Sequence, residues 1–192
     1  MLLLGGGVRA TASGAELLRP PRGYDQQALL GACIRCDRCR SACPQGCIAL
    51  GTLEQGWLNV DTPIMNFARG FCDFCESDPA GPRCVRVCAA GALGAVREST
   101  ATIASGNAAT TASYYIGCAV VDAEPRVHCQ KCVPVCAYSA IDWDDATQLP
   151  LVDKAVCNGC GACEFACPSD SFGYYGGVSH RAIYVVPEGG NR

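Results

Sequence analysis

The sequence predicts an α+β fold in which short hairpins and short helices are joined by irregular loops. The 192 residues include 17 cysteines, nearly all of them in four groups along the chain. Short β-prone runs and turn residues lie between the groups, and no segment has the length of a large helix or strand. Bulky core residues are scarce, with 5 Phe, 2 Trp and 2 Met. We therefore expect bound inorganic groups to fill part of the interior.

The N-terminal segment, residues 1–16, is apolar and then small and polar. Its run MLLLGGGV is too short to span a bilayer, which needs about 20 residues. It is typical of the end of a secretory signal, although a basic start and a twin arginine are missing. We expect a signal-peptide remnant whose true start lies upstream; the alternative is a correctly started chain with a flexible or packed N-terminal tip.

The elements expected after this segment are all short. Pro20 and Pro21 prevent an early helix, and residues 25–32 are expected to form one. A second short helix is expected at GACEFAC. β-prone runs follow in the order CIALG, WLNV, GALGAV, YYIGCAVV, AIDW, LPLVD and AIYVV.

The chain divides into two halves at an Ala-, Ser- and Thr-rich stretch. Residues 97–113 are predicted to be a linker. Residues 17–96 then hold the first two cysteine groups, and residues 114–192 hold the other two.

The cysteine groups look like repeats of one unit. The first and fourth, CIRCDRCRSACP and CNGCGACEFACP, share the spacing C-x2-C-x2-C-x3-C-P. The second, CDFCESDPAGPRCVRVC, has a longer second spacer, and the third is CQKCVPVC with an outlying cysteine before it. The candidate ligands are Cys33, Cys36, Cys39, Cys43, Cys72, Cys75, Cys84, Cys88, Cys118, Cys129, Cys132, Cys136, Cys157, Cys160, Cys163 and Cys167.

The shared spacing is a signature of bacterial ferredoxins, where the fourth Cys ligates the other 4Fe–4S cluster of a pair. Two-residue spacers let the backbone wrap one cubane, and the three-residue spacer starts a helical turn that carries the fourth thiol away. Gly159 and Gly161 allow close backbone approach and positive φ. We therefore predict tandem ferredoxin-like modules with four 4Fe–4S clusters and all sixteen cysteines as iron ligands.

Groups two and three depart from this signature. In group two, residues 78–82 are expected to form a loop inside the longer spacer. In group three, Arg126 stands where the first cysteine would be, and Cys118 is the expected substitute. A disulfide framework and zinc binding are the alternatives to clusters, but consecutive C-x2-C spacings and an odd cysteine total favour iron and sulfur.

Other residues have ordinary explanations. Cys47 is expected to be a small buried hydrophobe, and His128 and His180 surface or hydrogen-bonded residues. No nucleophile–base pair, phosphate loop or flavin fingerprint is present, so no substrate chemistry is expected. A net charge of −3 without a Lys/Arg run argues against a nucleic-acid partner.

With these residues in hand, the chain resembles the NapG/MauM-type ferredoxins, four-cluster accessory proteins of periplasmic nitrate reductase and methylamine dehydrogenase systems. The resemblance runs from Leu17 to Val186. Its specific parts are LLRPPRG followed by GACIRCDRCRSACP, the split second group, and the remote Cys118 before HCQKCVPVC. Cys47 is not part of that family's pattern.

The resemblance implies an electron-transfer protein exported with its cofactors by the twin-arginine route to the periplasmic face of the membrane. The implied partners are a membrane quinol-oxidising iron–sulfur protein (NapH-like) and a periplasmic oxidoreductase. The alternatives are the electron-transfer subunit of a molybdopterin oxidoreductase complex, a cluster-bearing maturation or chaperone protein, and a cytoplasmic polyferredoxin.

Related four-cluster electron-transfer subunits imply a nested pairing of the groups, first with fourth and second with third. In that scheme Cys167 completes the site of the first group, Cys43 that of the fourth, Cys136 that of the second, and Cys88 that of the third, which contains Cys118, Cys129 and Cys132.

Overall fold

The computed structural model describes residues 16–23, 25–94, 114–122, 128–169 and 181–187. The predicted linker at 97–113 and all but the last residue of the predicted signal remnant lie outside the described residues.

The first half is built from short helices around one hairpin. Its elements are α1 (Gln26–Ala32), α2 (Arg38–Ser41), β1 (Ile48–Leu50), the 3-10 turns η1 (Leu53–Gln55) and η2 (Trp57–Asn59), β2 (Pro63–Met65) and α3 (Arg83–Arg86). Strands β1 and β2 are antiparallel, with Ile48 opposite Met65. Helix α1 begins where the Asp25 carboxylate accepts a hydrogen bond from the Ala28 amide at 2.9 Å.

The second half contains two two-stranded sheets. Its elements are β3 (Cys118–Val121), β4 (Ile141–Asp144), β5 (Leu149–Val152), α4 (Ala162–Ala166) and β6 (Ile183–Val186). Strands β4 and β5 form a hairpin, whereas β3 pairs antiparallel with β6 from the far end of the half. The β3–β6 pair, which we call the clasp, therefore joins the beginning of this half to its end. Strand β5 lies against β3.

Three of the helices occupy the same place in their cysteine groups. Helices α2, α3 and α4 overlap the three-residue spacers before Cys43, Cys88 and Cys167. This confirms the helical turn that the spacing predicted, and the predicted helix at residues 25–32 is also present as α1. No helix in the described part of the chain is long and apolar enough to cross a membrane.

The strand predictions are confirmed in five of seven runs and wrong in two. WLNV forms η2 because a capping box between Thr52 and Gln55 winds the preceding turn, and Gly56 (φ 92°) then redirects the chain. In GALGAV the described residues 91–94 form a turn, with positive φ at Gly91 and Gly94, and the last two residues lie outside the described part of the chain. Strand β2 was not predicted from the sequence.

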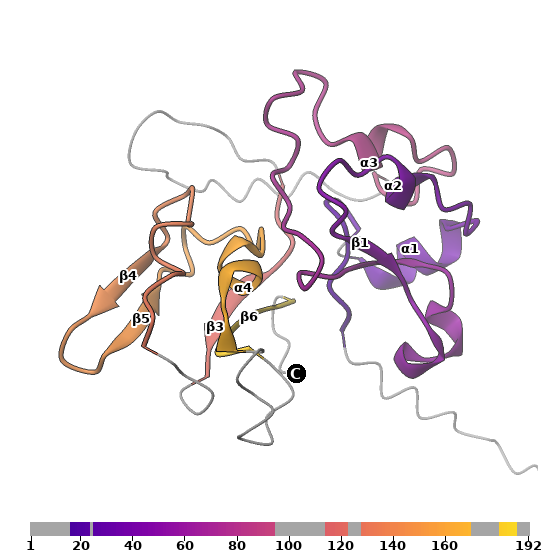
Figure 1. Cartoon of the computed structure of the whole chain (residues 1–192). Coiled ribbons are helices and arrows are strands. Elements are labelled where there is room, and N and C mark those ends of the chain that lie inside the picture. Colours follow the sequence, from indigo (N-terminus) through magenta and orange to yellow (C-terminus); the bar gives the residue numbers. More distant parts are fainter. Residues whose placement is uncertain (1–15, 24, 95–113, 123–127, 170–180, 188–192) are drawn as a thin grey trace, which may run out of the picture.

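The two halves lie side by side and share a buried surface (Figure 1). The main hydrophobic core joins Leu29, Ile48 and Phe67 of the first half with Ile116 and Val185 of the second. Several cysteines are part of it, namely Cys39, Cys47, Cys72 and Cys84. Thiols thus occupy positions that bulky side chains fill in an ordinary core.

The contact between the halves is close enough to involve the backbone. The Cys72 amide donates to the Cys160 carbonyl at 2.8 Å. A β-carbon at Gly161 would lie 2.2 Å from the Phe67 ring, so this glycine (φ 80°) permits the approach.

Candidate metal centres

All seventeen cysteines lie in the described residues, and all are free thiols. The disulfide alternative is therefore absent from this arrangement. The cysteines gather in four places, two in each half. We name these the outer and inner sites of the first half and the inner and outer sites of the second half, according to their distance from the contact between the halves.

The outer site of the first half is a pocket lined by four cysteines. Cys33, Cys36, Cys39 and Cys88 all line it, and it holds about 400 Å³ of free space, part of which is open solvent. Burial, with added effects of the Cys33 and Cys88 thiols, raises the pKa of Cys39 to about 11. Three cysteines of group one thus meet the last cysteine of group two.

The inner site of the first half combines the same two groups in the opposite way. Burial raises the pKa of Cys84, and the nearby thiols of Cys72, Cys43 and Cys75 raise it further. Burial also raises the pKa of Cys75, and the Asp73 carboxylate and the Cys72 and Cys43 thiols raise it further. Three cysteines of group two therefore meet the last cysteine of group one.

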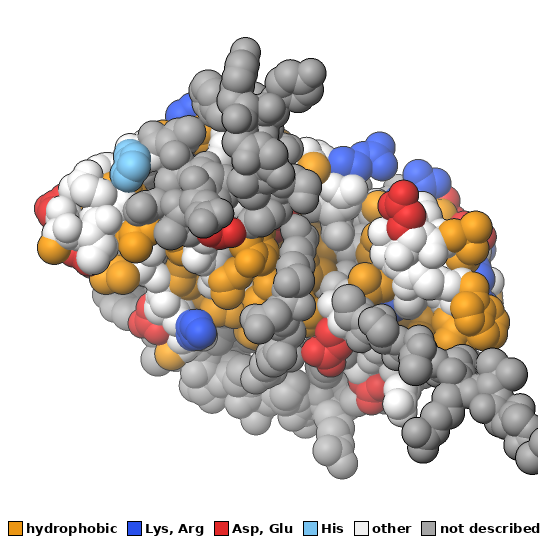
Figure 2. Space-filling model, turned by 90° about the horizontal axis from the view of Figure 1, so that it is seen from below, with side chains coloured by type: hydrophobic (Ala, Val, Ile, Leu, Met, Phe, Trp, Pro, Cys, Tyr) orange, Lys and Arg blue, Asp and Glu red, His pale blue; other side chains and the backbone are white. Residues whose placement is uncertain are grey.

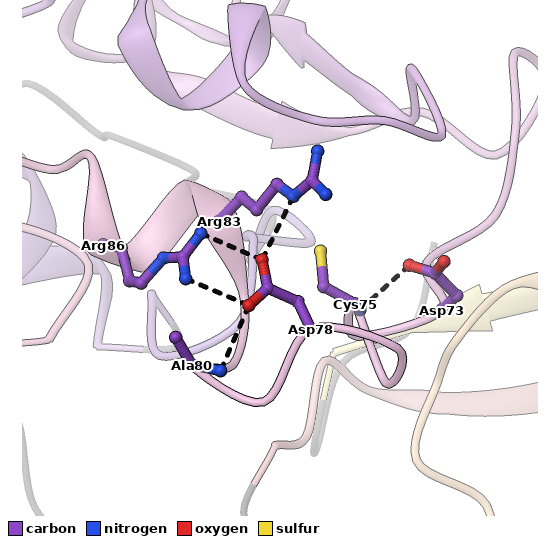
Figure 3. Close-up of polar contacts among 6 residues, drawn as sticks. All are labelled: Asp73, Cys75, Asp78, Ala80, Arg83 and Arg86. Atoms are coloured by element: carbon purple, nitrogen blue, oxygen red, sulfur yellow. Dashed lines mark hydrogen bonds and ion pairs between the residues drawn. The ribbon is translucent and has the colours of Figure 1, made fainter.

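The long spacer of group two is a folded loop, as predicted (Figure 3). The Asp78 carboxylate accepts hydrogen bonds from Arg86 at 3.0 and 3.1 Å, from Arg83 at 3.3 Å and from the Ala80 amide at 3.1 Å. These bonds tie the loop to both ends of the short helix α3. They hold Cys84 within reach of Cys75 although eight residues separate them in the sequence.

The inner site of the second half follows the same rule. Burial raises the pKa of Cys160 to about 12, with contributions from Cys136, Cys157 and Cys72. Burial also raises the pKa of Cys163, and Cys160, Cys157 and Cys136 add to it. Three cysteines of group four meet the last cysteine of group three, with Cys72 of the first half close by.

The outer site of the second half contains three cysteines. Cys129, Cys132 and Cys167 line a pocket with about 390 Å³ of free space, part of which is open solvent. Burial raises the pKa of Cys132, and Cys129 and Cys167 raise it further. His128 and Trp143 also line this pocket. His180 lies outside the described residues.

The two remaining cysteines each lie beside an inner site. The Cys47 and Cys43 sulfurs are 3.6 Å apart, and hydrogen bonding from Cys47 lowers the pKa of Cys43 to about 6. Hydrogen bonding from Cys118 likewise lowers the pKa of Cys157 to about 6. Cys47 is only 1% exposed, which confirms it as a buried residue.

The nested pairing is wrong, because the fourth cysteine of each group lies with the other cysteine group of the same half. Cys167 lines one pocket together with Cys132, and Cys88 lines another together with Cys39. Cys43 likewise lies near Cys84, and Cys136 lies near Cys163, each within its own half. Both the β1–β2 hairpin and the β3–β6 pair lie within a single half, so each half is closed on itself.

Cys118, the expected substitute for the cysteine missing from group three, lies beside the inner site of the second half, where the amide of the next residue, Ala119, donates to the Cys157 sulfur at 3.4 Å. Hydrogen bonding with Cys157 raises the pKa of the Cys118 thiol, and burial is the second cause. Strand β3 holds it opposite Val186, at the inner end of the clasp.

The loops around the cysteines repeat one backbone conformation. Positive φ occurs on both sides of the second cysteine of group one, at Arg35 (55°) and Asp37 (61°), and of group four, at Gly159 (74°) and Gly161 (80°). This winding turns successive amide groups inward, as a sulfur-rich anionic group requires. Amides also reach thiols directly at 3.3 to 3.4 Å, from Leu93 to Cys88, from Ala119 to Cys157 and from Ala140 to Cys136.

These features fit a polynuclear cluster better than a single ion. No three Cys, His, Asp or Glu side chains in the described ranges converge on one point, as they would around zinc. Thiols spread around a pocket suit a cubane, which needs one thiolate for each iron. The sites thus have the character of ferredoxin-type iron–sulfur centres.

Comparison with known proteins supports this class. The model of the 4Fe-4S dicluster domain matches residues 126–171, which contain groups three and four together. NapG of Escherichia coli strain K12, a ferredoxin-type protein, is 33% identical over 174 residues, which cover 82% of this chain and 68% of NapG.

Further relatives carry similar names. The methylamine utilization ferredoxin-type protein MauM of Paracoccus denitrificans is 29% identical over 185 residues, covering 90% of this chain and 72% of MauM. The ferredoxin-type protein NapF of E. coli K12 is 29% identical over 154 residues, covering 79% and 80%. The chain belongs to the NapG/MauM family of ferredoxin-type proteins.

Proposed function

We propose that the chain is an electron-transfer protein that carries up to four iron–sulfur clusters in two tandem ferredoxin-like modules. Residues 17–96 form the first module and residues 114–192 the second. In each, three cysteines of one group hold a cluster together with the fourth cysteine of the other group, except at the outer site of the second module. The clusters supply one-electron redox chemistry; the polypeptide holds, spaces and tunes them.

The contact between the inner sites is the observation that carries this proposal. The Cys72 amide bonds to the Cys160 carbonyl at 2.8 Å, and each residue belongs to an inner site. The Cys72 thiol also adds to the raised pKa of Cys160. The four sites therefore follow one another in a line, from the outer site of the first half to the outer site of the second.

The two ends of this line reach the surface. Cys36 and Cys129, one in each outer site, are exposed, whereas cysteines of the inner sites are half-buried or buried. Exposed apolar side chains of the first half include Trp57 (74%) and Leu53 (76%). Figure 2 shows hydrophobic surface at the first-half end of the molecule. A redox partner can thus approach each terminal cluster without unfolding the chain.

The proposed partners follow from the family. We infer that a membrane quinol-oxidising iron–sulfur protein delivers electrons and that a periplasmic oxidoreductase accepts them, with the chain on the periplasmic face. The names of the relatives support a place in a larger redox system, since MauM is a methylamine utilization protein. The chain itself binds no substrate in this scheme.

Reduction by partner-containing membranes tests the proposal. The holoprotein is purified without oxygen, and its clusters are followed optically after quinol is added to membranes of the host. The Cys160→Ser variant removes a ligand at the inner site of the second half, so we expect loss of that cluster and at least a tenfold slower passage of electrons to the acceptor.

Cys47→Ser is the matched control, since Cys47 is a buried cysteine outside the proposed ligand set. It should keep its clusters and its electron flow. Electron flow through the Cys160→Ser variant equal to that of the wild type would contradict electron transfer along the proposed line of clusters. Tight binding to the acceptor enzyme with no reduction of any cluster would instead favour the maturation role.

A further inference from the structure

The outer site of the second half differs from the other three sites in its number of thiols. Its pocket is lined by Cys129, Cys132 and Cys167, whereas four cysteines line the corresponding pocket of the first half. All seventeen cysteines are in described residues, so no further one is hidden elsewhere in the chain.

Backbone conformation identifies which ligand position lacks a cysteine. His128 (φ 47°) and Gln130 (φ 55°) flank Cys129 with the same pair of positive φ values that flanks the second cysteine of groups one and four. Cys129 is therefore the second cysteine of its loop. By the shared spacing the first would be residue 126, which is an arginine.

Cys118 is held away from this position. It lies on β3 opposite Val186, and its thiol donates to the Ala119 carbonyl at 3.5 Å. The Ala119 amide donates to the sulfur of Cys157 in the inner site at 3.4 Å. The next residue, Ala119, is 1% exposed and pairs with Val185, which is fully buried. Moving Cys118 to the outer site would break the β3–β6 clasp.

The pocket also contains a buried polar group without a partner among the described residues. The indole N–H of Trp143 is buried and has no hydrogen-bond partner among the described residues. Trp143 lines the same pocket as the three cysteines. An indole N–H cannot bind iron, but it can donate to a bridging sulfide of a bound cluster.

Building on the proposed function, we propose that this outer site binds its cluster through three thiolates only, so that one iron corner has no cysteine ligand. Such an iron is exchangeable. A one-electron oxidant removes it: the 4Fe–4S cluster in its 2+ state releases one Fe²⁺ and one electron and becomes a 3Fe–4S cluster in its 1+ state. One electron from a reductant together with one Fe²⁺ would restore the four-iron form.

Electron paramagnetic resonance of the full-length holoprotein tests this inference. Ferricyanide is added to anaerobically purified protein. We expect the near-isotropic signal of an oxidised three-iron cluster at about one spin per chain, because oxidised four-iron clusters are silent. Fe²⁺ with dithionite, followed by mild reoxidation, should remove the signal. Its absence from ferricyanide-treated protein that retains all its iron would overturn the inference.

Variants locate the signal. Arg126→Cys restores the full C-x2-C-x2-C-x3-C spacing and should abolish the three-iron signal, while the matched Arg126→Ser should keep it. Residue 126 lies outside the described residues, so its choice rests on spacing. Cys118→Ser should also keep the wild-type signal. A three-iron signal that appears only in Cys118→Ser would identify Cys118 as the fourth ligand and overturn the inference.

Chemical analysis separates this inference from the proposed function. Protein without iron and acid-labile sulfide would contradict the electron-transfer proposal itself. Protein with four intact four-iron clusters, stable to ferricyanide, would contradict only the three-thiolate site.

Discussion

At the scale of single residues, Arg19 shows how the first half prepares for an anionic group. Its side chain is 2% exposed and donates to Thr62 and to the Pro63 carbonyl at 2.9 Å. No carboxylate forms an ion pair with it in the described residues. Desolvation lowers the pKa of Arg19 to about 10, while nearby Cys33 raises it, so the guanidinium stays charged at neutral pH.

Replacing Arg19 by methionine should lower the reduction potential of the outer cluster of the first half. A buried cation stabilises the more negative reduced cluster, and we expect a shift on the order of tens of millivolts. The measurement is a redox titration monitored by electron paramagnetic resonance. Arg19→Lys keeps the charge and should restore most of the potential. An unchanged potential in the methionine variant would show that the charge is irrelevant to the cluster.

The sequence predicted the cysteine positions at this scale but not Arg19. Group spacing is local, so it identifies loops and their glycines directly, and positive φ at Gly159 and Gly161 confirms that prediction. Arg19 lies in LLRPP, and no local pattern marks it as buried. Its role arises from contacts with residues about 40 positions away, such as Thr62 and Asn59.

At the scale of elements, the clasp of the second half depends on close backbone contacts. A β-carbon at Gly159 would lie 2.4 Å from the Gly117 nitrogen, and one at Gly117 would lie 2.2 Å from the Val186 carbonyl oxygen. The Ile116 amide donates to the Asn158 carbonyl at 3.0 Å in the same layer. The cluster loop of group four is thus packed directly on the β3–β6 pair.

Gly159→Ala should therefore destabilise the second half by more than about 2 kcal/mol, because it adds a backbone clash to an unfavourable φ. The matched control is Gly31→Ala in α1, where a β-carbon meets nothing within 4 Å. That change should be neutral or add about 0.5–1 kcal/mol. The stability of both variants is measured as the temperature at which the absorbance of the clusters is lost. Equal temperatures for the two variants would contradict the close packing.

Sequence patterns predicted most elements but not how they pair. Apolar runs predicted β1, β3, β4, β5 and β6, yet the pairing of β3 with β6 depends on a contact across more than 60 residues. The nested scheme failed for the same reason. Identical spacing in groups one and four predicts the kind of site that each loop forms. The tertiary contacts within each half determine which fourth cysteine lies at that site.

At the scale of the whole molecule, the cysteines form a line of sites through a small core. The ends of the line are exposed at Cys36 and Cys129, and its middle is the Cys72–Cys160 contact between the halves. A chain with so few bulky apolar residues gains an interior when inorganic clusters occupy these sites. In the proposed scheme, electron transfer along the line and stability of the fold therefore depend on the same thiols.

Iron and acid-labile sulfide analysis of the anaerobically purified full-length protein, combined with Mössbauer spectroscopy, tests this most directly. We predict about fifteen or sixteen irons and about sixteen sulfides per chain, in four-iron clusters with one site able to lose an iron. Zinc in place of iron, or cysteine-bound metal without labile sulfide, would contradict it.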